Sequence, residues 1–76
     1  MSSFLYLTRV SDDWVPPGIR SPRSYLAALG ARLGGGKVVS DERGRPELVL
    51  SSARTTKRVN QVSAWVLKTY QDQDEA

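Results

Sequence analysis

Two segments of the chain have the short hydrophobic runs that are typical of β-strands. Residues 4–10 combine aromatic and aliphatic side chains over the length of one strand, and both faces of this segment are largely apolar. Residues 37–50 place two aliphatic runs on either side of a polar turn at 41–44, where Gly44 suits the positive φ of a type I turn with a bulge. Pro46 lacks a backbone donor, so we expect it near the start of its strand. The pattern predicts one strand and, later, a β-hairpin.

A third segment repeats its leucines at helical spacing. Ser21 followed by Pro22 is typical of a helix start, because the hydroxyl caps the first turn and proline suits the first helical position. The glycine run 34–36 ends this helix. Gly30, inside it, costs about 1 kcal/mol of helix propensity unless close packing requires a glycine.

A longer amphipathic helix is predicted at the C-terminal end of the sequence. We expect Ser51 or Ser52 to cap it and the helix to run to about Gln71. Its apolar stripe faces the core, and the residues of that stripe are Val59, Val62, Val66, Leu67 and Tyr70.

The elements therefore follow the order strand, helix, strand, strand, helix. The helical crossover predicts that the first two strands run parallel, and the hairpin makes the third antiparallel to the second. We expect a single α+β domain over residues 1–71, with a three-stranded mixed sheet, its third strand central, and both helices packed on one face. Trp14 and Ile19 are predicted to close one end of the core. Residues 72–76 are predicted to form an acidic disordered tail.

The chemistry available to the chain is narrow. Among its 76 residues there is no cysteine and no histidine, which excludes a disulfide, a thiolate zinc site and an imidazole base. The acidic pairs 12–13 and 41–42 lie in turn sequences, where carboxylates commonly cap the backbone. Gly36-Lys37 is followed by Val38, where a phosphate loop needs a hydroxyl for magnesium. We therefore expect no catalysis, no cofactor and no metal.

The element order resembles that of an RNA-recognition-motif domain that lacks its last strand. Leu5-Tyr6-Leu7 is similar to the motif on that family's first strand, and Arg43-Gly44 is similar to the beginning of its second motif. Arg45, Glu47 and Leu50, however, stand where the base-stacking aromatic residues belong. We assign no family on this basis.

Positive charge is concentrated toward the C-terminal end. Residues 51–71 carry four Lys/Arg and no acid, whereas the net charge of the whole chain is +3. On a helical wheel these cations form a basic strip opposite the apolar stripe, with Trp65 and Arg58 at its border. The arginines Arg43 and Arg45 at the hairpin tip would extend the strip. The predicted binding residues are Arg54, Lys57, Arg58, Gln61, Trp65, Lys68, Arg43 and Arg45.

Two functions fit this pattern, and both involve binding. The first is nucleic-acid binding, to DNA or RNA, in which the cations contact phosphates, Gln61 contacts a base or sugar and Trp65 stacks or wedges. The alternative is a protein-protein interaction module that recognises an acidic protein surface, or a partner at a sheet face carrying Phe4 and Tyr6. Such a module would be a phage or mobile-element protein that binds a host protein, or a homodimer through a sheet edge. We expect a cytoplasmic protein with no membrane segment.

Overall fold

The computed structural model describes residues 5–74. Their order of elements is the predicted one, with a short 3-10 turn added after the first strand. The elements are β1 (Tyr6–Ser11), η1 (Asp12–Trp14), α1 (Pro22–Arg32), β2 (Gly36–Ser40), β3 (Pro46–Thr55) and α2 (Thr56–Asp74).

The three strands form one open sheet in the order β1-β3-β2. β3 is central, as predicted, and it pairs antiparallel with both neighbours. β1 and β2 therefore run in the same direction but never pair with each other, so the sheet is antiparallel rather than mixed. The α+β class is confirmed.

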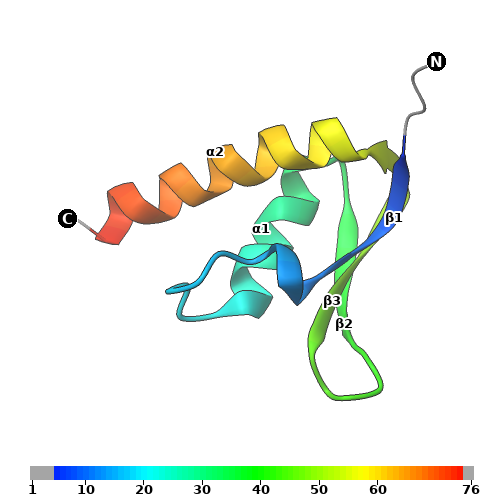
Figure 1. Ribbon diagram of the computed structural model, residues 1–76, viewed down its shortest axis with the longest axis horizontal. Coiled ribbons are helices and arrows are strands. Elements are labelled where there is room, and N and C mark those ends of the chain that lie inside the picture. The colour runs from blue at the N-terminus through cyan, green and yellow to red at the C-terminus, as the bar shows by residue number, and fades with distance from the viewer. Residues whose placement is uncertain (1–4, 75–76) are drawn as a thin grey trace.

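Both helices lie on one side of this sheet (Figure 1). α1 runs beside the strands, and α2 crosses the upper end of the sheet and continues past it over α1. Between them the core contains the predicted valine stripe of α2, and Trp14 and Ile19 pack against this core as predicted. The buried residues are Val10, Tyr25, Leu26, Leu29, Leu33, Leu48, Leu50, Val59, Val62 and Val66.

The ends of α1 follow the sequence prediction. Ser21 is the N-cap, and its hydroxyl oxygen accepts a hydrogen bond from the Ser24 N–H at 3.3 Å. Pro22 begins the helix, and Gly34 adopts a φ of 94° just after the C-cap, Leu33. Only glycine adopts this left-handed conformation without strain, so the glycine run stops the helix here.

The start of α2 differs from the prediction. Ser51 and Ser52 are not helix caps but lie in β3, which continues to Thr55. β3 is extended because it pairs with the beginning of β1 beyond a bulge: Leu7 lies opposite Arg54, whereas Arg9 lies opposite Val49. The cap is Thr55, whose hydroxyl accepts a hydrogen bond from the Arg58 N–H at 3.1 Å.

The end of α2 also lies beyond its predicted position. The helix passes Gln71 and continues to Asp74. The first part of the acidic segment predicted as a tail is thus helical backbone, and residues 75–76 lie outside the described part of the chain.

Gly30 allows α1 to approach the sheet closely. A Cβ atom at this position would lie 2.7 Å from the Cδ1 of Leu48, a side chain that is itself fully buried. Because the Leu48 side chain is enclosed by the core, it cannot simply turn away. Gly30 therefore lowers the helix propensity of α1 but allows the helix to pack closely against the sheet.

We expect Gly30→Ala to lower the free energy of unfolding by about 1 kcal/mol, because overpacking outweighs the gain in helix propensity. In a Leu48→Val background, which lacks the Cδ atoms, the same substitution should instead stabilise the protein by up to about 1 kcal/mol. Urea unfolding of the four proteins forms a double-mutant cycle that measures the difference. Equal effects of Gly30→Ala in both backgrounds would contradict the close contact.

A buried tyrosine joins the two helices. Tyr25 of α1 is fully buried, and its hydroxyl lies 2.8 Å from both the carbonyl oxygen and the Oγ of Ser63 in α2. Its ring also packs against Tyr70, with 5.5 Å between the ring centroids. These contacts set the distance between α1 and α2.

Tyr25→Phe should lower the free energy of unfolding by about 1 kcal/mol, because it removes the hydrogen bond to α2 while the aromatic packing remains. Ser63→Ala is the matched comparison: it deletes only the Oγ partner and leaves the carbonyl acceptor, so its effect should be smaller. Chemical denaturation of both variants checks the order, and the reverse order would show that the carbonyl bond contributes little.

Candidate nucleic-acid interface

The predicted basic strip on α2 is broken at Arg54. This residue lies on β3, because the strand continues to Thr55. Its guanidinium donates to the carbonyl oxygen of Ala53 at 3.1 Å and to both oxygens of Ser52, and it lies over Gly34. Arg54 is therefore bound to the backbone of its own strand and does not belong to the helix surface.

The cations that do lie on α2 are exposed but do not share one face. Lys57 and Lys68 are eleven residues apart, which places them at nearly the same angle and about 16 Å apart along the helix axis. Arg58 is turned about 100° from Lys57. Asp72 and Asp74 occupy the opposite end of the helix from Lys57 and Arg58. The helix thus presents two separate basic faces.

The arginines of the hairpin tip lie far from this helix. Arg43 and Arg45 are exposed, and their backbone N–H groups donate to the Asp41 carboxylate at 2.9 and 2.8 Å. The turn that holds them projects from the lower end of the sheet, whereas α2 crosses the upper end (Figure 1). They do not extend the basic surface of α2, contrary to the sequence prediction.

The structure brings three of the predicted residues together around Arg32, which is not one of the residues predicted from the sequence. Arg32, the last residue of α1, places its guanidinium carbon 4.1 Å from the ring centroid of Trp65 in a cation-π contact. Trp65 remains 48% exposed. Arg58 and Gln61 line the same hollow, which has a volume of about 380 Å³ and includes Val62. We refer to Arg32, Arg58, Gln61 and Trp65 as the Trp65 cluster.

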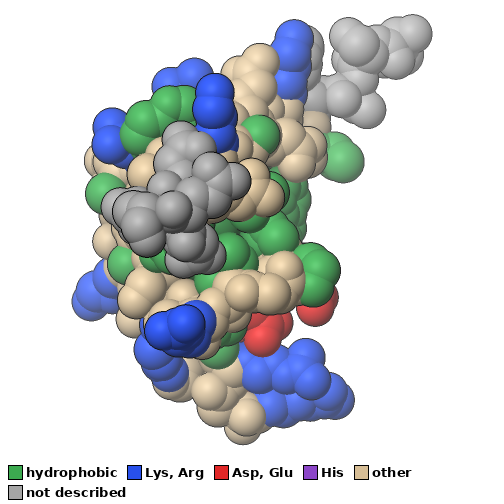
Figure 2. Space-filling view, turned by 90° about the vertical axis from the view of Figure 1, so that its left-hand side faces the viewer, with side chains coloured by type: hydrophobic (Ala, Val, Ile, Leu, Met, Phe, Trp, Pro, Cys, Tyr) green, Lys and Arg blue, Asp and Glu red, His purple; other side chains and the backbone are tan. Residues whose placement is uncertain are grey.

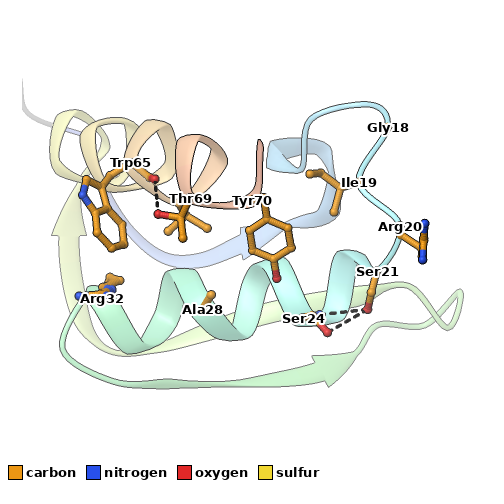
Figure 3. A pocket seen from close by; sticks show the side chains of 11 residues that line it. Gly18, Ile19, Arg20, Ser21, Ser24, Ala28, Arg32, Trp65, Thr69 and Tyr70 are labelled. Atoms are coloured by element: carbon orange, nitrogen blue, oxygen red, sulfur yellow. Dashed lines mark hydrogen bonds between the residues drawn. The ribbon is translucent and has the colours of Figure 1, made fainter. Parts of the chain in front are cut away.

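A longer groove between α1 and α2 begins at this cluster. Its volume is about 700 Å³, and we call it the interhelical groove. Figure 3 shows Trp65, Thr69 and Tyr70 along its upper side and α1 below, with Arg32 and Arg20 at opposite ends. Because Arg32 and Trp65 line both hollows, their stack separates the groove from the smaller one. Among the side chains that the structure describes, those lining the groove include no acid.

Among the described side chains, few cations are neutralised by neighbouring carboxylates. Among the side chains that the structure describes, the one ion pair joins Arg9 to Glu47 at 2.9 Å on the sheet. Figure 2 shows Lys and Arg side chains at the top, left and bottom of the molecule, and the acidic side chains coloured red at the lower right. The positive charge is distributed over several surfaces. The surface formed by α1 and α2, the helical side of the molecule, combines charge with the exposed ring of Trp65.

Two other features are absent from the part of the chain that the structure describes. No group of three acidic, histidine or cysteine residues is placed to hold a metal ion. Neither α1 nor α2 is long and apolar enough to cross a membrane.

Arg32 could not be selected from its sequence neighbourhood. It appears there as a basic residue in the last turn of a helix, which is a common and favourable position. Its contact with Trp65, thirty-three positions later, depends on the packing of α2 over α1. The helical wheel did place Trp65 at the border between the apolar and basic faces of α2, which is where an aromatic ring reaches a neighbouring helix.

Comparison with known proteins gives no relative from which a function can be transferred. No family model matches the chain, no curated protein matches it, and no solved structure matches its fold.

We expect the stack of Arg32 on Trp65 to contribute a measurable coupling energy. A double-mutant cycle with Arg32→Ala, Trp65→Ala and the double variant should give about 0.5–1 kcal/mol, the range for an exposed cation-π contact. Thermal or urea unfolding provides the four free energies. Arg20→Ala in place of Arg32→Ala is the control, and its coupling to Trp65 should be close to zero; equal coupling for both arginines would argue against the stack.

Proposed function

We propose that this protein binds nucleic acid without catalysis and that the Trp65 cluster is the centre of the binding surface. The observation that carries this proposal is that two helices place Arg32 and Arg58 around one hollow beside a half-exposed tryptophan. Arginine neutralises phosphate through a planar set of donors, and a neighbouring aromatic ring offers a surface to a base or sugar. Gln61, on the same hollow, supplies hydrogen bonds to either.

The rest of the surface supports the same function. Lys57 and Lys68 are exposed on α2 and add positive charge along the helix that carries Trp65. Contacts of this kind give binding that depends strongly on salt and little on base sequence. The absence of cysteine and histidine from the sequence removes the commonest nucleophile-base pairs, which supports a binding role over an enzymatic one. The partner is DNA or RNA, and a cytoplasmic location agrees with it.

The test removes two charges from the Trp65 cluster and compares the result with the same loss elsewhere. In the variant Arg32→Gln/Arg58→Gln, the slope of log affinity against log salt should become shallower by about 1.4 for single strands or about 1.8 for duplex DNA, the values for two lost phosphate contacts. Fluorescence anisotropy with labelled oligonucleotides measures the slope.

The control variant is Arg43→Gln/Arg45→Gln at the hairpin tip, which has the same net charge but leaves the helical side intact. Its slope should stay within about 0.3 of the wild-type value, since these arginines lie away from the proposed surface. An equal change in both variants would mean that binding follows net charge alone and would refute the assignment to the Trp65 cluster.

A protein partner is the second candidate, and one observation favours it. Leu5, just before β1, and Tyr6, its first residue, are 69% and 64% exposed, and β1 is an edge strand of the sheet. An apolar edge of this kind can pair with a strand from a partner or from a second copy of the chain. Phe4, which was predicted to share a sheet face with Tyr6, lies outside the described residues. Failure of the wild-type protein to bind any polynucleotide at low salt would favour this second function.

A further inference from the structure

The interhelical groove continues from the Trp65 cluster along the whole length of α1. We infer that this groove binds a single strand of nucleic acid, laid along α1 from Arg32 to Arg20. This inference rests on the proposed function and specifies its ligand: an unpaired strand rather than a duplex.

Charge and length fit an extended anionic chain. Arg32 lies at one end of the groove and Arg20 at the other (Figure 3). The helix between them has 11 residues, so the two ends are about 16 Å apart along its axis. None of the lining residues that the structure describes, which end at Tyr70, is acidic, so along this part of the groove an anionic backbone meets a cation at each end.

The lining between the two arginines suits nucleobases. Trp65 and Tyr70 contribute aromatic rings from α2, and the half-buried Ala28 of α1 leaves room for a flat group opposite them. Bases of a single strand are free to turn into such a groove and contact aromatic side chains, whereas a duplex keeps its bases stacked inside and offers mainly phosphates.

Hydroxyl groups at the Arg20 end supply polar contacts. The Ser24 Oγ accepts a hydrogen bond from the Ser21 hydroxyl at 3.1 Å, while the Ser21 Oγ accepts one from the Ser24 N–H. Ser24 therefore keeps its own hydroxyl proton for a ligand. An acidic peptide would also satisfy the two arginines, but its carboxylates have no flat apolar face to place against Trp65 and Tyr70. Nucleic acid therefore matches more of the lining.

The experiment fills the groove with a bulky side chain. Ala28→Phe projects a ring into the groove, and Ala27→Phe, on the exposed side of the same helix, is the matched control. The affinity of each variant for a twelve-nucleotide oligothymidine and for the corresponding duplex is measured by anisotropy at low salt. Ala28→Phe should weaken binding of the single strand by about tenfold or more, the loss expected when one base no longer stacks. Its affinity for the duplex, and both affinities of Ala27→Phe, should change less than about twofold.

A second pair of variants does not depend on the fold tolerating a new ring in the groove. Arg20→Gln should make the salt dependence of oligothymidine binding shallower by about 0.7, the value for one phosphate contact of a single strand. Arg23→Gln should leave it unchanged, since Arg23 does not line the groove and donates to the Ser40 Oγ at 2.6 Å.

The outcomes separate this inference from the proposed function. If oligothymidine binding is unaffected by Ala28→Phe and Arg20→Gln but still depends on Arg32 and Arg58, the groove is not the site and the inference is overturned, while the proposed function stands. If no polynucleotide binds, the proposed function itself fails. If polyglutamate of equal length displaces oligothymidine at equal concentration, the groove recognises acidic chains in general, which also overturns the inference.

Discussion

The packing of α2 on α1 through Tyr25 is the interaction on which the proposed binding surface depends. Tyr25 is buried, and its hydroxyl reaches α2 at Ser63 while its ring packs against Tyr70. Together with the buried valines of α2, this contact fixes the separation of the helices. That separation brings Arg32 of one helix over Trp65 of the other and leaves the groove open beside them. The buried contact of Tyr25 and the exposed contact between Arg32 and Trp65 therefore depend on the same packing of α2 on α1.

The sequence predicted correctly those helix and turn boundaries that depend on a few adjacent residues. Ser21 with Pro22 and the glycines after Leu33 define α1 because capping and positive φ are properties of a few adjacent positions. Gly44, with a φ of 79°, ends the hairpin turn for the same reason. The valine stripe of α2 was equally visible, since burial of one helix face requires a fixed spacing. These features required no knowledge of tertiary contacts.

The boundary between β3 and α2 could not be predicted in the same way. Ser51 and Ser52 are good helix caps in isolation, but pairing with residues almost fifty positions earlier in β1 keeps this stretch extended. The consequence for function is direct, because the longer strand removes Arg54 from the helix surface. Arg32 was missed for the related reason that its partner lies on another element. The sequence thus indicated a basic helix, whereas the particular arginines beside Trp65 are determined by long-range packing.

The contact between Arg32 and Trp65 also favours this surface over the other basic regions as the proposed binding site. A free arginine loses side-chain entropy when it is fixed against a phosphate, and this loss reduces the affinity that the contact provides. Arg32 is already held over the indole ring, so part of that entropy is lost on folding rather than on binding. Arg43 and Arg45, whose backbones are fixed by Asp41 but whose side chains are exposed, have no comparable support. Equal charge therefore does not imply equal binding, and a preorganised guanidinium beside an aromatic ring favours the helical side of the molecule.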